Sequence, residues 1–174
     1  LISQSGKIYS LVSEKKRAWH AGQSYWRGNT DINSISIGIE MDYSPSDINN
    51  KYSFKLNFAL IFLLKKLIKK YKISTENILG HSDIAPYRKI DPGKHFPWQM
   101  LENKKLSYRI HPINRSNITN NLINKWFHKN KLNSNKKKIL FMLNFIGYDI
   151  SLAKKNKIYF NQLINAYSLS LIHI

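Results

Sequence analysis

The segment from residue 80 to residue 93, GHSDIAPYRKIDPG, brings together groups that could hold a metal ion and act on a carbonyl. His81 and Asp91 stand ten positions apart, and Lys89 comes two before the aspartate. Imidazole and carboxylate are ligands suited to zinc, and an ammonium group can stabilise charge on an attacked carbonyl oxygen. Pro86 and the closing Pro-Gly pair stiffen and turn the backbone around them. Taken alone, a histidine and an aspartate on a polar loop are more often a turn cap and a surface charge.

Three further stretches make the pattern specific. They are KIYSLVSEKKRAWHAG at 7–22, NSISIGIEM at 33–41 and FPW at 96–98. In this order, and with the segment at 80–93, they resemble the zinc-dependent N-acetylmuramoyl-L-alanine amidases of the type-2 amidase family, relatives of the animal peptidoglycan recognition proteins. The resemblance covers roughly residues 1–101. It implies an α/β fold with a mixed central sheet flanked by helices, and a monomer.

The resemblance implies a reaction and roles for four residues. The reaction is hydrolysis of the amide between N-acetylmuramic acid and L-alanine, in peptidoglycan or muropeptides. His81 and Asp91 would be two ligands of Zn²⁺. Glu40 would take a proton from zinc-bound water and pass it to the leaving amine, and Lys89 would stabilise the oxyanion.

The third zinc ligand of the family is a histidine upstream of the stretch at 7–12, and this chain begins after that point. We therefore expect weak zinc binding and little turnover from the chain as it stands. The resemblance gives His20, in the WHAG motif, a place in the substrate groove. Trp19, His20, Trp26 and Arg88 are the predicted contacts to the muramyl-peptide, since aromatic faces suit sugar rings and Arg suits carboxylates. Core packing is the alternative for both tryptophans.

Hydrophobic periodicity predicts the elements that would position these groups. Residues 34–41 alternate strictly, so we expect a strand with one buried apolar face and Glu40 on the opposite face, over a cleft. The buried residues would be Ile35, Ile37, Ile39 and Met41. We also expect strands at 7–12 and 77–80, the second ending just before His81. A helix at 54–71 carries one apolar stripe, and Ser53 is its expected N-cap.

Charge and periodicity change after the first hundred residues. Residues 1–100 carry a net charge of +7 and residues 101–174 one of +11. We therefore expect a catalytic domain at 1–101, a linker at 102–115 and an all-helical appendage at 116–174. Three helical patterns follow one another in this appendage, and the last of them covers residues 158–169. The appendage weakly resembles a peptidoglycan-binding module, and a basic helical bundle of unknown role is an equal alternative.

Composition narrows the partners and the compartment. The net charge is +18, yet 23 lysines accompany only 5 arginines, and arginine is the residue favoured for phosphate and base contacts. We therefore expect no nucleic-acid partner, although a basic nucleic-acid binder is one rival function. The other rival is a non-catalytic peptidoglycan-binding protein. The chain has no cysteine and no apolar run of membrane-spanning length. We expect the periplasm or outer envelope of a bacterium, with the cytoplasm as the alternative.

Overall fold

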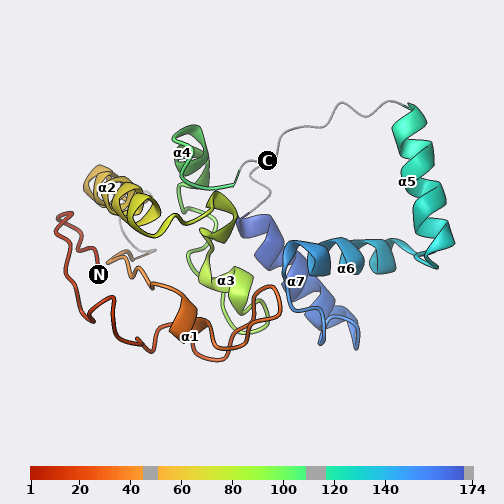
Figure 1. Cartoon of the computed structure of the whole chain (residues 1–174), viewed down its shortest axis with the longest axis horizontal. Coiled ribbons are helices and arrows are strands. Elements are labelled where there is room, and N and C mark those ends of the chain that lie inside the picture. The colour runs from red at the N-terminus through yellow and green to blue at the C-terminus, as the bar shows by residue number, and fades with distance from the viewer. Residues whose placement is uncertain (45–50, 109–116, 171–174) are drawn as a thin grey trace.

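The structure is a computed structural model that describes residues 1–44, 51–108 and 117–170. Helices dominate it (Figure 1). One long helix and several short ones alternate with extended segments in the first 108 residues, and three helices follow. The elements are α1 (Ile32–Ile35), α2 (Phe54–Tyr71), the 3₁₀ helix η2 (Thr75–Asn77), α3 (His81–Ile84), α4 (Trp98–Asn103), α5 (Asn117–Lys129), α6 (Asn135–Ile146) and α7 (Lys157–Ser170).

Helix α2 confirms the predicted helix, with its bounds and its cap. The Ser53 side chain accepts a hydrogen bond from the backbone N–H of Leu56 at 3.2 Å. At the other end Lys72 is left-handed, and its N–H bonds to the carbonyl of Ile68. The apolar stripe of α2 packs against α4 in the first core cluster. The buried members of this cluster are Ile2, Tyr52, Leu56, Ala59, Leu60, Leu64, Trp98, Leu101 and Leu106.

The predicted mixed central sheet was wrong. In the described parts of the chain, strand-like pairing is confined to isolated bridges. Ile2 pairs antiparallel with Ile8 and parallel with Met41, and the third bridge lies within the turn at 26–29. A sheet needs continuous partner strands on both sides of its central strand. Here the stretch at 34–41 meets the Ile2 backbone only at its end, through bonds from Ile2 N to Glu40 O and from Asp42 N to Ile2 O, both 2.8 Å.

Burial along this stretch also differs from the alternating pattern. Ile35 closes helix α1 and is 64% exposed, and Ile37 is 40% exposed. Ile39 alone of the three packs against the first core cluster. The strand predicted at 77–80 is replaced by the end of η2 and an extended link into α3. Alternation therefore identified extended backbone at 36–41, and the expected burial failed because no strand in the described residues covers Ile35 and Ile37.

The three helical patterns of the C-terminal region correspond to α5, α6 and α7. Ser134 caps α6 by accepting from Lys137 N, and Gly147 ends it at a φ of 140°. A Cβ at Gly147 would lie 2.6 Å from Arg27 Cγ, so the tight approach of the N-terminal loop requires glycine there. The predicted linker falls partly on residues 109–116, outside the described residues.

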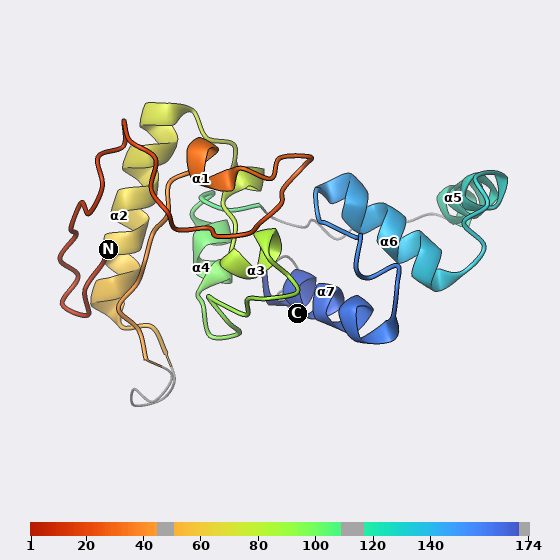
Figure 2. The same cartoon turned by 90° about the horizontal axis from the view of Figure 1, so that it is seen from below.

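The C-terminal helices pack onto the first part of the chain. Helix α7 lies against α3, while α5 lies at the end of the molecule farthest from α2 in both views (Figures 1 and 2). A second core cluster joins the loops at 21–32 to α6 and α7. Its buried members are Ala21, Trp26, Ile32, Leu140, Leu143, Tyr148, Ala153, Leu163 and Ala166. None of the helices in the described ranges is long and apolar enough to cross a membrane.

Candidate active site

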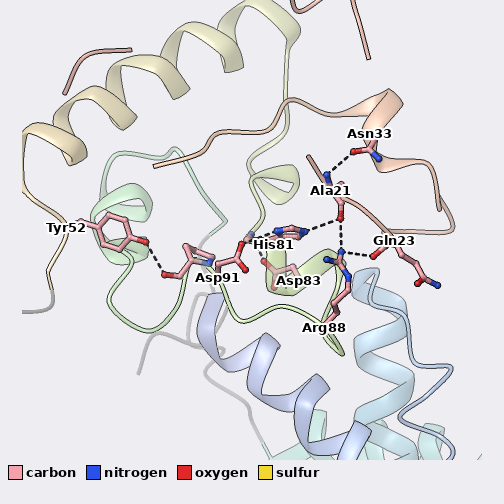
Figure 3. Close-up of polar contacts among 10 residues, drawn as sticks. Ala21, Gln23, Asn33, Tyr52, His81, Asp83, Arg88 and Asp91 are labelled. Atoms are coloured by element: carbon pink, nitrogen blue, oxygen red, sulfur yellow. Dashed lines mark hydrogen bonds and ion pairs between the residues drawn. The ribbon is translucent and has the colours of Figure 1, made fainter. Parts of the chain in front are cut away.

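The segment at 80–93 closes on itself and brings its two ends together. Ser82 N donates to Asp91 O at 2.9 Å. Gly80 allows this closure, since a Cβ there would lie 2.7 Å from Pro92 Cδ. As a result, His81 Nδ1 and Asp91 Oδ2 are 3.0 Å apart (Figure 3). The structure thus places the two predicted zinc ligands side by side.

The second ring nitrogen of His81 indicates which tautomer is present. Nε2 lies 3.0 Å from the carbonyl oxygen of Ala21, which can only accept a hydrogen bond, so Nε2 carries the hydrogen. In a neutral ring, Nδ1 then turns a lone pair towards the Asp91 carboxylate. Two lone pairs in contact call for a proton or a cation. An imidazole that donates one N–H to a backbone carbonyl is also the usual arrangement of a metal-ligating histidine.

The backbone around Ala21 is held by side chains from two segments, helix α1 and the segment at 80–93 (Figure 3). Asn33 Oδ1 accepts from His20 N at 3.0 Å and from Ala21 N at 2.8 Å. Arg88 donates to Ala21 O at 2.8 Å and to Gln23 O at 2.9 Å. The Ala21 carbonyl thus accepts from Arg88 and His81 together. This clamp holds the WHAG loop against the loop that carries the predicted ligands.

Asp83 ties the same loop to the C-terminal helices. It is fully buried, and its carboxylate accepts from Gly80 N at 2.7 Å, from the Tyr148 hydroxyl at 2.5 Å and from the Ser170 hydroxyl. Burial raises the pKa of Asp83 to about 6, and the three donors oppose that rise because they favour the charged carboxylate. Helix α3, which begins with His81, is therefore anchored by Ser170 of α7 and by Tyr148, which lies two positions after the end of α6.

The pair of predicted ligands borders a cavity of about 280 Å³. Glu40, His81 and Asp91 all line it, so the predicted general base shares one space with the predicted ligands. His20 and Gly38 line it as well. Gly38 lies in close contact with the His20 ring, because a Cβ at position 38 would be only 2.5 Å from His20 Cγ. The small residue in the IGIE stretch thus leaves room for the His20 side chain.

The other predicted site residues lie in different surroundings. Lys89 is partly buried and is not among the residues lining the cavity. Trp19 is 81% exposed, with the Arg17 guanidinium 4.2 Å from the centre of its ring. Trp26 is 7% exposed and meets the Tyr148 ring edge-on at 5.2 Å, in the second core cluster.

The residues present fit zinc in the type of ligand they offer, but there are fewer of them than a catalytic zinc site normally has. Across the described ranges, no group of three or more His, Cys, Asp or Glu side chains converges on one point. His81 and Asp91 supply two donors of the kinds that zinc prefers, and the lone pair on Nδ1 is available to a cation. The residues present therefore match part of a zinc site.

Sequence reasoning missed the residues that support the site. Asn33 gives no local signal, because its partners lie twelve and thirteen positions away. Asp83 stands within the quoted segment, two residues after His81, and the apolar Ile84 and Ala85 that follow it are only a weak signal of a buried carboxylate. Its partners Tyr148 and Ser170 follow 65 and 87 positions later, which no local pattern indicates.

Comparison with known proteins confirms the resemblance. Residues 1–94 match the family model described as N-acetylmuramoyl-L-alanine amidase. N-acetylmuramoyl-L-alanine amidase AmiD of Escherichia coli K12 is 46% identical over 101 residues, which cover 55% of this chain and 37% of that protein. 1,6-Anhydro-N-acetylmuramyl-L-alanine amidase AmpD of Haemophilus influenzae is 40% identical over 100 residues, 57% of this chain and 53% of that protein. The chain thus spans only part of these relatives.

Solved structures extend the likeness further along the chain. AmiD from E. coli, in complex with anhydro-N-acetylmuramic acid-L-Ala-D-gamma-Glu-L-Lys, aligns with a TM-score of 0.76 at 29% identity. AmpDh3 from Pseudomonas aeruginosa, in complex with anhydromuramic pentapeptide, aligns with a TM-score of 0.73 at 29% identity. Each alignment covers 95% of this chain and 64% of the other. The structural likeness therefore includes the C-terminal helices, beyond the residues matched by the family model.

Proposed function

The chain belongs to the N-acetylmuramoyl-L-alanine amidase family, and we propose that it hydrolyses the amide between the lactyl group of N-acetylmuramic acid and L-alanine. The observation that carries this proposal is the shared cavity of Glu40, His81 and Asp91. Two relatives that align over nearly the whole chain are described with anhydro-muramyl peptides bound. We therefore take muropeptides as the substrate class.

His81 and Asp91 would be two of the ligands that hold Zn²⁺. The chemistry that a bound zinc supplies is polarisation of the scissile carbonyl and a lower pKa for water. Glu40 is exposed to the cavity, so its carboxylate can accept a proton from the attacking water. The water oxygen bonds to the lactyl carbonyl carbon, the carbon–nitrogen bond breaks, and Glu40 returns the proton to the amine of L-alanine.

The remaining residues would bind and orient the substrate. Trp19 offers an exposed aromatic face for a sugar ring, and His20 forms part of the cavity wall. The guanidinium of Arg88 is engaged by two backbone carbonyls, so its first contribution is to hold the groove loop in place. Trp26 supports that loop from the core. Lys89 would reach the oxyanion only after its side chain moves towards the cavity.

We also propose that the protein works in the bacterial envelope, where peptidoglycan lies. Fractionation of the source cells, with the protein detected by antibody, would test this. Recovery only in the cytosolic fraction would contradict it.

The activity itself is tested by incubating the chain with anhydro-N-acetylmuramyl-tripeptide and zinc and measuring free tripeptide by chromatography. We expect slow release that depends on zinc and that is lost in the His81→Ala variant. His95→Ala is the matched control, because His95 is exposed and does not line the cavity. Binding of muropeptide without release, equal in all three proteins, would favour the rival function of a non-catalytic peptidoglycan-binding protein.

A further inference from the structure

Helices α5 and α6 lie towards the end of the molecule away from α2 (Figures 1 and 2). Together they carry several large apolar side chains that are exposed. We call these five side chains the α5–α6 strip. They are Leu122, Trp126, Phe141, Met142 and Phe145, with exposed fractions of 63%, 47%, 39%, 44% and 82%. Contiguous exposed apolar patches of this kind mark interaction surfaces.

The strip is continuous across the two helices. The rings of Trp126 and Phe141 have centroids 5.3 Å apart, so the apolar residues of α5 abut those of α6. On α6, Phe141 and Phe145 lie one turn apart, on the face opposite the buried Leu140 and Leu143. Helix α6 is therefore apolar on two faces, and only one of them is covered by the core.

The charge around the strip has a single sign. Residues 117–147 contain six lysines and no aspartate or glutamate. Lys138 Nζ lies 5.3 Å from the centre of the Phe127 ring, and Lys125, Lys129 and Lys137 are exposed. Basic helices with exposed tryptophan, phenylalanine and leucine are typical of segments that lie in the interface of an anionic membrane.

We propose that the α5–α6 strip docks the protein on the surface of an anionic lipid bilayer. The apolar side chains would enter the boundary between headgroups and acyl chains, and the lysines would contact lipid phosphates. A nucleic acid would use the lysines but offers no apolar phase for Leu122 and Phe145. Glycan strands are likewise polar. The proposal is independent of the amidase reaction, because the strip lies outside the catalytic cavity.

Vesicle co-sedimentation tests the proposal with the whole chain. We expect binding to vesicles of phosphatidylglycerol and phosphatidylcholine, little binding to phosphatidylcholine alone, and release by high salt. The double variant Leu122→Ser/Phe145→Ser should partition at least about tenfold more weakly. The matched control is Phe54→Ser/Phe58→Ser, which removes two phenylalanines that are 82% and 64% exposed on α2. Circular dichroism checks that both variants fold.

A second measurement locates the contact. Trp126→Phe should still bind vesicles but should lose the blue shift of tryptophan emission, whereas Trp19→Phe should keep it. Equal losses for the two double variants, or a blue shift that depends on Trp19, would place the contact elsewhere and overturn the proposal. So would strip variants that bind vesicles normally but lose binding to DNA or to purified peptidoglycan, because the strip would then serve another partner.

Discussion

Tyr148 and Asp83 stand 65 positions apart in the sequence, and the Tyr148 hydroxyl donates a 2.5 Å hydrogen bond to the Asp83 carboxylate. Both residues are buried. The bond joins the end of the α6 segment to the helix that carries His81. It makes the C-terminal helices part of the support of the candidate active site.

Replacing Tyr148 by Phe should therefore destabilise the fold by about 1–3 kcal/mol, because a buried carboxylate loses one of its three donors. Urea unfolding measures the loss. The matched control is Tyr87→Phe, which removes a hydroxyl that donates to Asp149 O at 2.6 Å and leaves no charged group unpaired. A loss of stability as large in the control as in Tyr148→Phe would contradict this role of Asp83.

Gly38→Ala should destabilise the protein through one contact. The new Cβ would lie 2.5 Å from His20 Cγ, and overpacking of this kind costs about 1–3 kcal/mol. Thermal unfolding of the single variant gives the cost. The double variant Gly38→Ala/His20→Ala should recover part of it, since the ring is gone while the Cβ at position 20, 2.8 Å from the new methyl group, remains. If the two losses simply add, the strain arises from another neighbour.

Glu40→Gln and His81→Ala should separate catalysis from metal binding. The first should bind zinc as tightly as the unchanged chain does and should lower its slow release of tripeptide by about a further 10²–10⁴-fold, because an amide cannot accept the proton. The second should lose both zinc and activity. Metal analysis after gel filtration, combined with the tripeptide-release assay, measures both properties. Loss of zinc in Glu40→Gln would instead make Glu40 a ligand.

Zinc should bind this chain more weakly than it binds an amidase with three protein ligands. His81 and Asp91 provide two donors in the described ranges, and catalytic zinc normally has three. Competition with a colorimetric chelator gives the dissociation constant, and Asp91→Asn should raise it further. An affinity equal to that of a three-ligand relative would show that a further side chain of this chain joins the site.

The sequence predicted the four longest helices well because their signals are local, whereas the short helices α1, α3 and α4 were not predicted. Helix α2 repeats its apolar residues at the helical period and starts at a serine cap, and Gly147 ends α6 as expected. The mixed sheet was not predicted correctly, because strand pairing depends on partners elsewhere in the chain. Alternation at 34–41 gave no information on whether a neighbour covers Ile35 and Ile37, and both are exposed.

The candidate site divides in the same way. The short spacing of His81 and Asp91 on one loop agrees with their 3.0 Å separation, and the expectation that Glu40 faces a cleft agrees with its place in the cavity lining. Their supports could not be predicted, since the clamp on Ala21 and the donors to Asp83 come from distant segments. The catalytic, metal-binding and substrate-binding roles of all the predicted site residues stay predictions.

The clamp on Ala21 affects how the groove would tolerate change. A strand is held by backbone hydrogen bonds that almost any residue can make, so its attachment survives most substitutions. The groove loop is held instead by the side chains of Asn33, Arg88 and His81. Each is chemically specific, so sensitivity to substitution should be concentrated at these positions. The neighbouring loop residues should tolerate substitution better. Substrate preference could therefore diversify while the loop stays in place.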